Sequence, residues 1–179
     1  MSASKEFVID FGSLEPGEHE FEFEVKDSFF QEYPDSPVLR ANLDVLVTMD
    51  KSEQMMLLDF TIAGDLSVNC DRCLEELELE LETFNELIVK FGESEEEDSE
   101  DVIIIPASEH EIDVSRFIYE YITVLIPMRN VHEDEEGNPQ CDPEALKNIE
   151  KYIKTEKEEG KDDDDNDPRW DALRNINLN

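Results

Sequence analysis

Two segments of the chain alternate strictly between apolar and acidic residues. Within residues 19–25, Phe and Val alternate with Glu, and within residues 77–82, Leu alternates with Glu. Successive side chains of an extended strand point to opposite faces, so this period of two predicts strands with one apolar and one acidic face. We therefore expect Leu77, Leu79 and Leu81 to face the core of a β-sheet, while the intervening glutamates face water.

The remaining patterns predict an α+β fold. Strands are expected at residues 6–11, 19–25, 38–50, 55–69, 77–91 and 102–105. Residues 27–37 are expected to be a connection. The apolar spacing then changes to that of helices over residues 112–127 and 141–154, with Asp113 and Asp142 as the expected N-caps. We expect an antiparallel sheet or partly closed β-barrel from residues 5–105, followed by two helices and a tethered C-terminal helical turn.

The chain is expected to form one domain over residues 1–155. Residues 92–101 are predicted to be a disordered loop, because they are acidic and lack the apolar atoms that would hold a fixed conformation. Residues 156–167 have the same character and are interpreted as an acidic linker. The linker leads to a C-terminal segment, residues 168–179.

The formal net charge of the chain is −34 at pH 7. Proteins bind a phosphate backbone with Lys and Arg that displace its counterions, so a chain this acidic repels RNA and DNA. The charge favours a basic protein as partner, or a surface that mimics nucleic acid. The sequence has no signal-peptide pattern and no apolar run long enough for a membrane helix. With an odd number of cysteines, these features predict a cytoplasmic protein.

The three cysteines are the most informative chemical groups. Cys70 and Cys73 form a C-x2-C pair between two predicted strands, and such a turn directs both sulfurs to one point. A redox pair is disfavoured, because it would be expected at the start of a helix in a βαβ unit. A closed tetrahedral zinc site needs two more ligands. Cys141 and His132 would complete a Cys3His set that ties the β half of the chain to its helical half.

Two other interpretations of these residues stay open. The three cysteines would also serve as small core or turn residues, with His132 on the surface. Cys141 with His132 as its base would give a nucleophile and hence a hydrolase. That interpretation is weaker, because the sequence shows nothing that orients the histidine and no oxyanion donors.

Three motifs, in this order, resemble the YceD family, a bacterial and plastid group associated with accumulation of large-subunit ribosomal RNA. They are CDRCLEELELELE at residues 70–82, IDVSRFIYEYITVLIPMRNVH at 112–132 and DPRWDAL at 167–173. The resemblance covers nearly the whole chain and implies a non-enzymatic role in making or stabilising this rRNA. Many members carry further paired cysteines between the second and third motifs, where this chain has only Cys141, with His132 upstream.

The charge and the resemblance together predict the class of partner. We expect the chain to act through a basic large-subunit ribosomal protein or a precursor of the 50S subunit, with rRNA bound indirectly. The alternative is an acidic nucleic-acid mimic that inhibits a basic DNA- or RNA-binding protein.

Four residues are candidate partner contacts: Arg72, Arg169, Trp170 and Leu173. An acidic tether that ends in an amphipathic turn with the sole Trp suits docking on a partner. Alternatively, Trp170 folds back onto the apolar surface of its own domain. The two arginines would either pair with local carboxylates or contact a phosphate.

Overall fold

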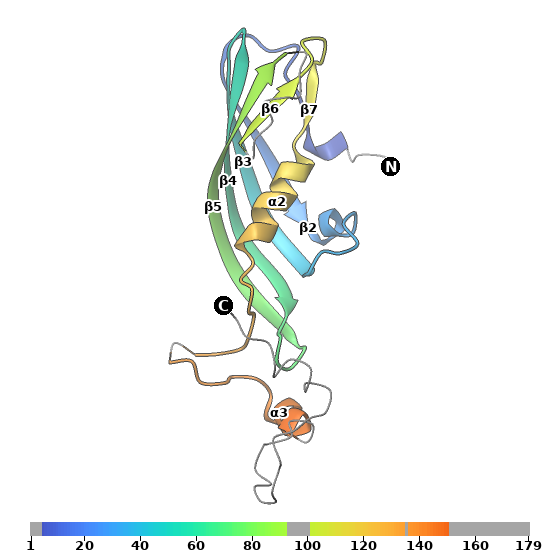
Figure 1. The fold of residues 1–179 in the computed structure, drawn as a ribbon, viewed down its shortest axis with the longest axis vertical. Coiled ribbons are helices and arrows are strands. Elements are labelled where there is room, and N and C mark those ends of the chain that lie inside the picture. Colours follow the sequence, from blue (N-terminus) through green and yellow to red (C-terminus); the bar gives the residue numbers. More distant parts are fainter. Residues whose placement is uncertain (1–4, 93–100, 135, 151–179) are drawn as a thin grey trace, which may run out of the picture. The chain divides into compact units, whose positions relative to one another are not determined.

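The alternating segments become strands of one five-stranded sheet in the computed structural model (Figure 1). The strand order is β2-β3-β4-β5-β6, which follows the sequence. The strands are β2 (Gly17–Lys26), β3 (Val38–Lys51), β4 (Met55–Asn69), β5 (Glu76–Phe91) and β6 (Val102–Ile105). Because β2 and β6 are edges that do not meet, the sheet is open, and the predicted α+β class is confirmed.

The structure describes residues 5–92, 101–134 and 136–150. The predicted disordered loop falls largely, and the predicted linker and C-terminal segment entirely, outside these residues. The chain divides into two compact units, Met1–Asp142 and Pro143–Asn179. Helix α3 (Pro143–Glu150) belongs to the second unit and begins directly after Asp142, the expected N-cap. Within the described residues, no helix has the length and apolar character needed to cross a membrane.

One face of the sheet is covered and forms the core. Figure 1 shows α2 (Ser115–Leu125) and β7 (Glu111–Asp113) on the concave side of the curved sheet. The small strand β1 (Val8–Asp10) pairs with β7, and the chain enters β1 through a 3-10 turn, Lys5–Phe7. The leucines of the second alternating segment pack against this core while its glutamates are exposed, as the alternation predicted.

Three details differ from the sequence prediction. Strand β6 runs parallel to β5, not antiparallel, with Val102 opposite Ile88 and Ile105 opposite Phe91. Residues 27–30 form a one-turn helix, α1 (Asp27–Phe30), that buries Phe29 and Phe30. Residues 111–113 form β7, so α2 starts later than expected: its N-cap is Val114, and Asp113 accepts a hydrogen bond from the Ser115 N–H.

The packing of α2 on the sheet gives a first testable prediction. Phe60 of β4 is 1% exposed and meets Tyr121 of α2 edge to face, with ring centroids 5.3 Å apart. Phe60→Ala leaves a cavity there, and we expect it to lower the free energy of unfolding by about 3–5 kcal/mol. Urea denaturation followed by far-UV circular dichroism measures this change.

Phe84→Ala is the matched control for that substitution. Phe84 lies on the next strand but on the other face of the sheet, where it is 70% exposed. Because its ring contributes little buried area, we expect a loss within about 0.5 kcal/mol. Equal losses for the two variants would mean that the core does not lie between the sheet and α2.

Candidate metal centre

The turn between β4 and β5 presents the C-x2-C pair. We call residues 70–75 the cysteine turn. It is closed by two backbone hydrogen bonds, from the Leu74 N–H to the Cys70 carbonyl at 2.9 Å and from the Cys70 N–H to the Glu75 carbonyl at 2.8 Å. Leu74 adopts a left-handed conformation with a φ of 63°. This tight turn places both thiols on one side, facing the chain that follows α2.

The second pair of ligand candidates comes from the ligand loop, residues 126–142. The Gln140 N–H donates to the His132 carbonyl at 2.8 Å, so the loop folds back on itself and brings Cys141 beside His132. Two further bonds hold this loop to the cysteine turn: the Asp71 N–H donates to the Asn130 carbonyl, and the Asn130 N–H donates to the Asp71 carboxylate, each at 2.6 Å.

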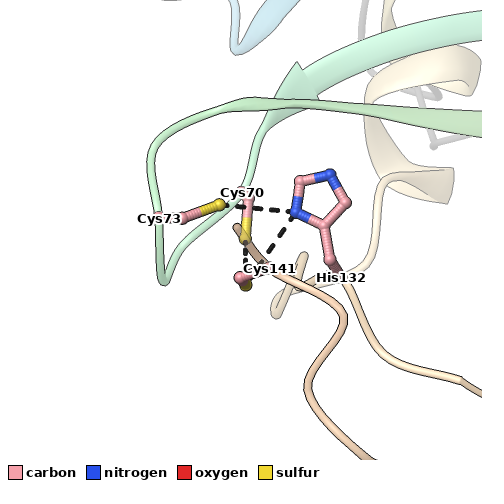
Figure 2. Close-up of side chains that lie close together, drawn as sticks. All are labelled: Cys70, Cys73, His132 and Cys141. Atoms are coloured by element: carbon pink, nitrogen blue, oxygen red, sulfur yellow. Dashed lines mark hydrogen bonds between the residues drawn. The ribbon is translucent and has the colours of Figure 1, made fainter. Parts of the chain in front are cut away.

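The four predicted ligands converge on one point. Figure 2 shows Cys70, Cys73, His132 and Cys141 with their donor atoms turned toward one another. These atoms all lie within 4.8 Å of one another. The Cys70 and Cys141 sulfurs are 3.9 Å apart, and Nδ1 of His132 lies 3.4 Å from the Cys73 sulfur and 4.0 Å from that of Cys141. Tetrahedral zinc with bonds of about 2.1–2.3 Å separates its ligand atoms by roughly 3.5–3.8 Å. The spacing suits such an ion.

A backbone carbonyl fixes the orientation of the histidine. Nε2 of His132 lies 3.0 Å from the Glu76 carbonyl oxygen, which can only accept a hydrogen bond. Nε2 therefore donates to this carbonyl, and Nδ1 is the ring nitrogen that faces the sulfurs of Cys73 and Cys141. Metal-bound histidines are held by this kind of outer contact. The sequence could not reveal it, because any residue at position 76 has a carbonyl.

The two thiols of the cysteine turn are held in different protonation states. Burial raises the pKa of Cys70, but the backbone N–H groups of Cys73, Arg72 and His132 outweigh it and bring the pKa to about 6. Burial raises the pKa of Cys73 to about 11, with the neighbouring sulfurs of Cys70 and Cys141 adding to the rise. The protein alone thus favours a thiolate at Cys70 beside a protonated thiol at Cys73. A divalent cation would supply the charge that three adjacent thiolates need.

Arg72 pairs locally. Its guanidinium donates to Glu133 at 2.5 Å and lies 3.9 Å from the Cys141 sulfur. Arg129 shares the same carboxylate at 2.7 Å. The hydrogen bond from Arg72 holds the pKa of Glu133 below its usual value. This ion-pair network, which the sequence did not reveal, places a positive charge beside the cluster.

The other interpretations fit the geometry less well. Cys141 is 5% exposed, whereas a nucleophile must reach a substrate. Packing of small core residues does not require three sulfurs and an imidazole nitrogen to converge on one point, as they do here. Arg169, Trp170 and Leu173 lie outside the described residues, so their predicted contacts stay predictions.

A comparison with protein families matches most of the chain. The family described as "Large ribosomal RNA subunit accumulation protein YceD" matches residues 58–177, a range that contains all four clustered residues. Neither the search of curated proteins nor the search of solved structures found a match.

Proposed function

Because the chain belongs to the YceD family of large ribosomal RNA subunit accumulation proteins, we propose that it supports this accumulation by binding a basic large-subunit ribosomal protein or a 50S precursor. The family description names the process, which is accumulation of large-subunit ribosomal RNA. The net charge of −34 is the observation that selects the class of partner. On this proposal the chain has no catalytic step, and rRNA is reached through the bound protein.

The basic side chains support an indirect route to rRNA. Lys26, Arg40, Arg72, Arg116 and Arg129 each form an ion pair with a carboxylate. A phosphate contact would have to break such a pair and overcome the repulsion of the surrounding acids. The partner then needs to be cationic, which describes a ribosomal protein better than a nucleic acid.

We also propose that the Cys3His cluster holds a structural zinc ion. Its ligands are Cys70 and Cys73 of the cysteine turn with His132 and Cys141 of the ligand loop. The set is closed, with no position left for a substrate, which is typical of structural sites. The ion would fix the ligand loop against the cysteine turn.

Sedimentation tests the proposed function. In cells that depend on this chain, we expect its loss to lower large-subunit rRNA relative to small-subunit rRNA. We expect tagged chain to travel with 50S precursors in a density gradient. Purified large-subunit rRNA, stripped of protein and mixed with the pure chain at physiological salt, should not bind it. Tight binding of that bare rRNA would contradict the indirect route.

A second candidate function is mimicry of nucleic acid. The observation that favours it is the set of glutamates Glu18, Glu20, Glu22 and Glu24 of β2, which point the same way at the two-residue spacing of a strand, about 6.8 Å. A mimic would bind a DNA- or RNA-binding protein unrelated to ribosomes, and nucleic acid would displace it. Competition by added duplex DNA distinguishes the two functions.

A further inference from the structure

One face of the five-stranded sheet stays uncovered in the described part of the chain. We call it the open face. It consists of the side chains that alternate with the core residues along β2 to β6. Phe84, midway along β5, is 70% exposed, and Thr61 and Leu46, which follow it across β4 and β3, are half-buried. The strand register decides which of these residues lie side by side.

The open face is acidic across its whole width. The basic side chains on it are Lys26, Arg40 and Lys90. Its acidic side chains are Glu18, Glu20, Glu22, Glu24, Asp44, Asp50, Asp59, Asp65, Glu76, Glu78, Glu80, Glu82 and Glu86. Lys26 and Arg40 pair with Glu24 and Glu76, so most of this charge has no opposing base on the face.

Two rows on this face carry apolar side chains, and we call them the apolar rows, although Glu22 continues the first and Asp50 the second. The register aligns Leu46 of β3 with Thr61 of β4 and Phe84 of β5. A second row aligns Leu57, Ile88 and Val102. Between them lies a row with Asp59 opposite Glu86. The two apolar rows thus flank one acidic row, and neighbouring rows are about 6.8 Å apart along the strands. Apolar side chains that gather on neighbouring strands within an acidic surround are typical of an interaction surface.

Two hollows on the sheet add to this pattern. A shallow groove of about 560 Å³ runs over β2, β3 and β4, and its lining combines Leu46 with the carboxylates of Glu22 and Asp44. A second hollow, of about 250 Å³, is lined in part by the carboxylates of Asp65 and Glu78 and by the guanidinium of Arg40. Carboxylates line both hollows, and the first also has Leu46 beside them, which suits a cationic chain with apolar residues between its charges.

We propose that the open face docks a segment of a cationic protein in which Lys or Arg residues are interspersed with apolar ones. The acidic rows would pair with the cations, and Phe84 with Leu46 would take an apolar side chain. A second copy of this chain, an anionic membrane and RNA all carry the wrong charge for this surface. This proposal rests on the proposed function in one respect: the proposed function identifies the cationic protein as a ribosomal protein.

Fluorescence anisotropy with two labelled peptides tests the proposal. The first peptide contains equal parts Lys and Leu, and in the second Ser replaces every Leu. We expect the full-length chain to bind the Lys–Leu peptide about tenfold more tightly than the Lys–Ser peptide. Phe84→Ala should weaken binding of the Lys–Leu peptide about tenfold and leave the affinity for the Lys–Ser peptide unchanged. The reason is that Phe84 would contact the leucine side chains, which the second peptide lacks.

Two charge variants test whether the peptides bind at the open face. The face variant combines Glu22→Gln, Glu82→Gln and Glu86→Gln. The loop variant combines Asp35→Asn, Glu53→Gln and Glu109→Gln at exposed loop positions, and so has the same net charge. We expect the face variant to bind both peptides about fivefold more weakly and the loop variant to change by less than about twofold. Equal losses in the two variants would overturn the proposal, since binding would then follow net charge alone.

Two further readouts complete the test. If the chain's own C-terminal segment occupied the open face, Phe84→Ala would shift the fluorescence of the sole tryptophan, Trp170, and this would also overturn the proposal. Wild-type chain that binds the peptide but does not travel with 50S precursors would count against the proposed function alone. Face and loop variants that travel equally well with those precursors would count against the open face alone.

Discussion

Cys141→Ala is expected to abolish binding of a stoichiometric zinc ion and to release the ligand loop from the cysteine turn. Cys141 is the only ligand candidate that ties the far end of the loop to the cluster, and its sulfur lies 3.9 Å from that of Cys70. With one ligand missing, the remaining three leave the ion open to water. A structural site that loses a ligand in this way loses both metal and stability.

The loss of stability is expected to be local. In zinc-finger peptides, metal binding is worth about 10–16 kcal/mol, because the whole fold depends on it. Here the sheet has its own core of buried residues, including Phe60, Leu58 and Val47. We therefore expect the sheet to stay folded, while the amides of Asp71, Asn130 and Gln140 lose about 100-fold of their hydrogen-exchange protection, or about 2.8 kcal/mol.

Elemental analysis and hydrogen exchange measure these two effects. Wild-type chain should carry one zinc ion, and an excess of chelator should reproduce the exchange pattern of Cys141→Ala. His110→Ala is the control, because His110 is exposed and lies outside the cluster. His132→Cys would offer a set of four thiolates, a usual structural site, and should keep zinc where His132→Ala does not. Full protection in metal-free protein would show that hydrogen bonds alone hold the loop.

The sequence predicted the strands whose alternation is complete and missed what depends on distant pairing. The Phe–Glu and Leu–Glu alternations set both the strands and their faces, because burial of one face acts on every second residue. Strand β7 contains three residues, and its partner β1 lies about a hundred residues earlier in the chain. No local pattern encodes such a pair. The α1 turn was not predicted for a similar reason, since four residues are too few to show a helical period.

The clustering of the three cysteines with His132 was predictable because chemistry limited the choice. Cys70 and Cys73 share a turn, and only one other cysteine and few histidines exist in the chain. The orientation of His132 was not predictable, because it depends on a backbone carbonyl of β5. The apolar rows of the open face were hidden for another reason. Leu46, Thr61 and Phe84 stand alone at outward positions of three strands, and only the register brings them together.

We expect a rise in salt concentration to weaken binding of a cationic peptide to the open face more than any of the substitutions above. Raising the ionic strength from about 0.1 M to about 1 M shortens the Debye length from about 10 Å to about 3 Å. Carboxylates on neighbouring strands of the open face, such as Asp59 and Glu86, are about 5 Å apart at their backbones. At the lower salt concentration their fields overlap and add. At the higher concentration each acts nearly alone, and a cationic partner is no longer steered.

We therefore expect the association rate of the Lys–Leu peptide to fall by about 100-fold over this range, within the roughly 10- to 1,000-fold that electrostatic steering contributes. The dissociation rate should change much less, because it depends on the desolvated contacts around Phe84. Stopped-flow mixing measures both rates. The face variant should show a shallower salt dependence than the loop variant, although the two have the same net charge. A dependence that is equally steep in both would assign the steering to the whole anionic chain, and the open face would then have no special part in capturing the partner.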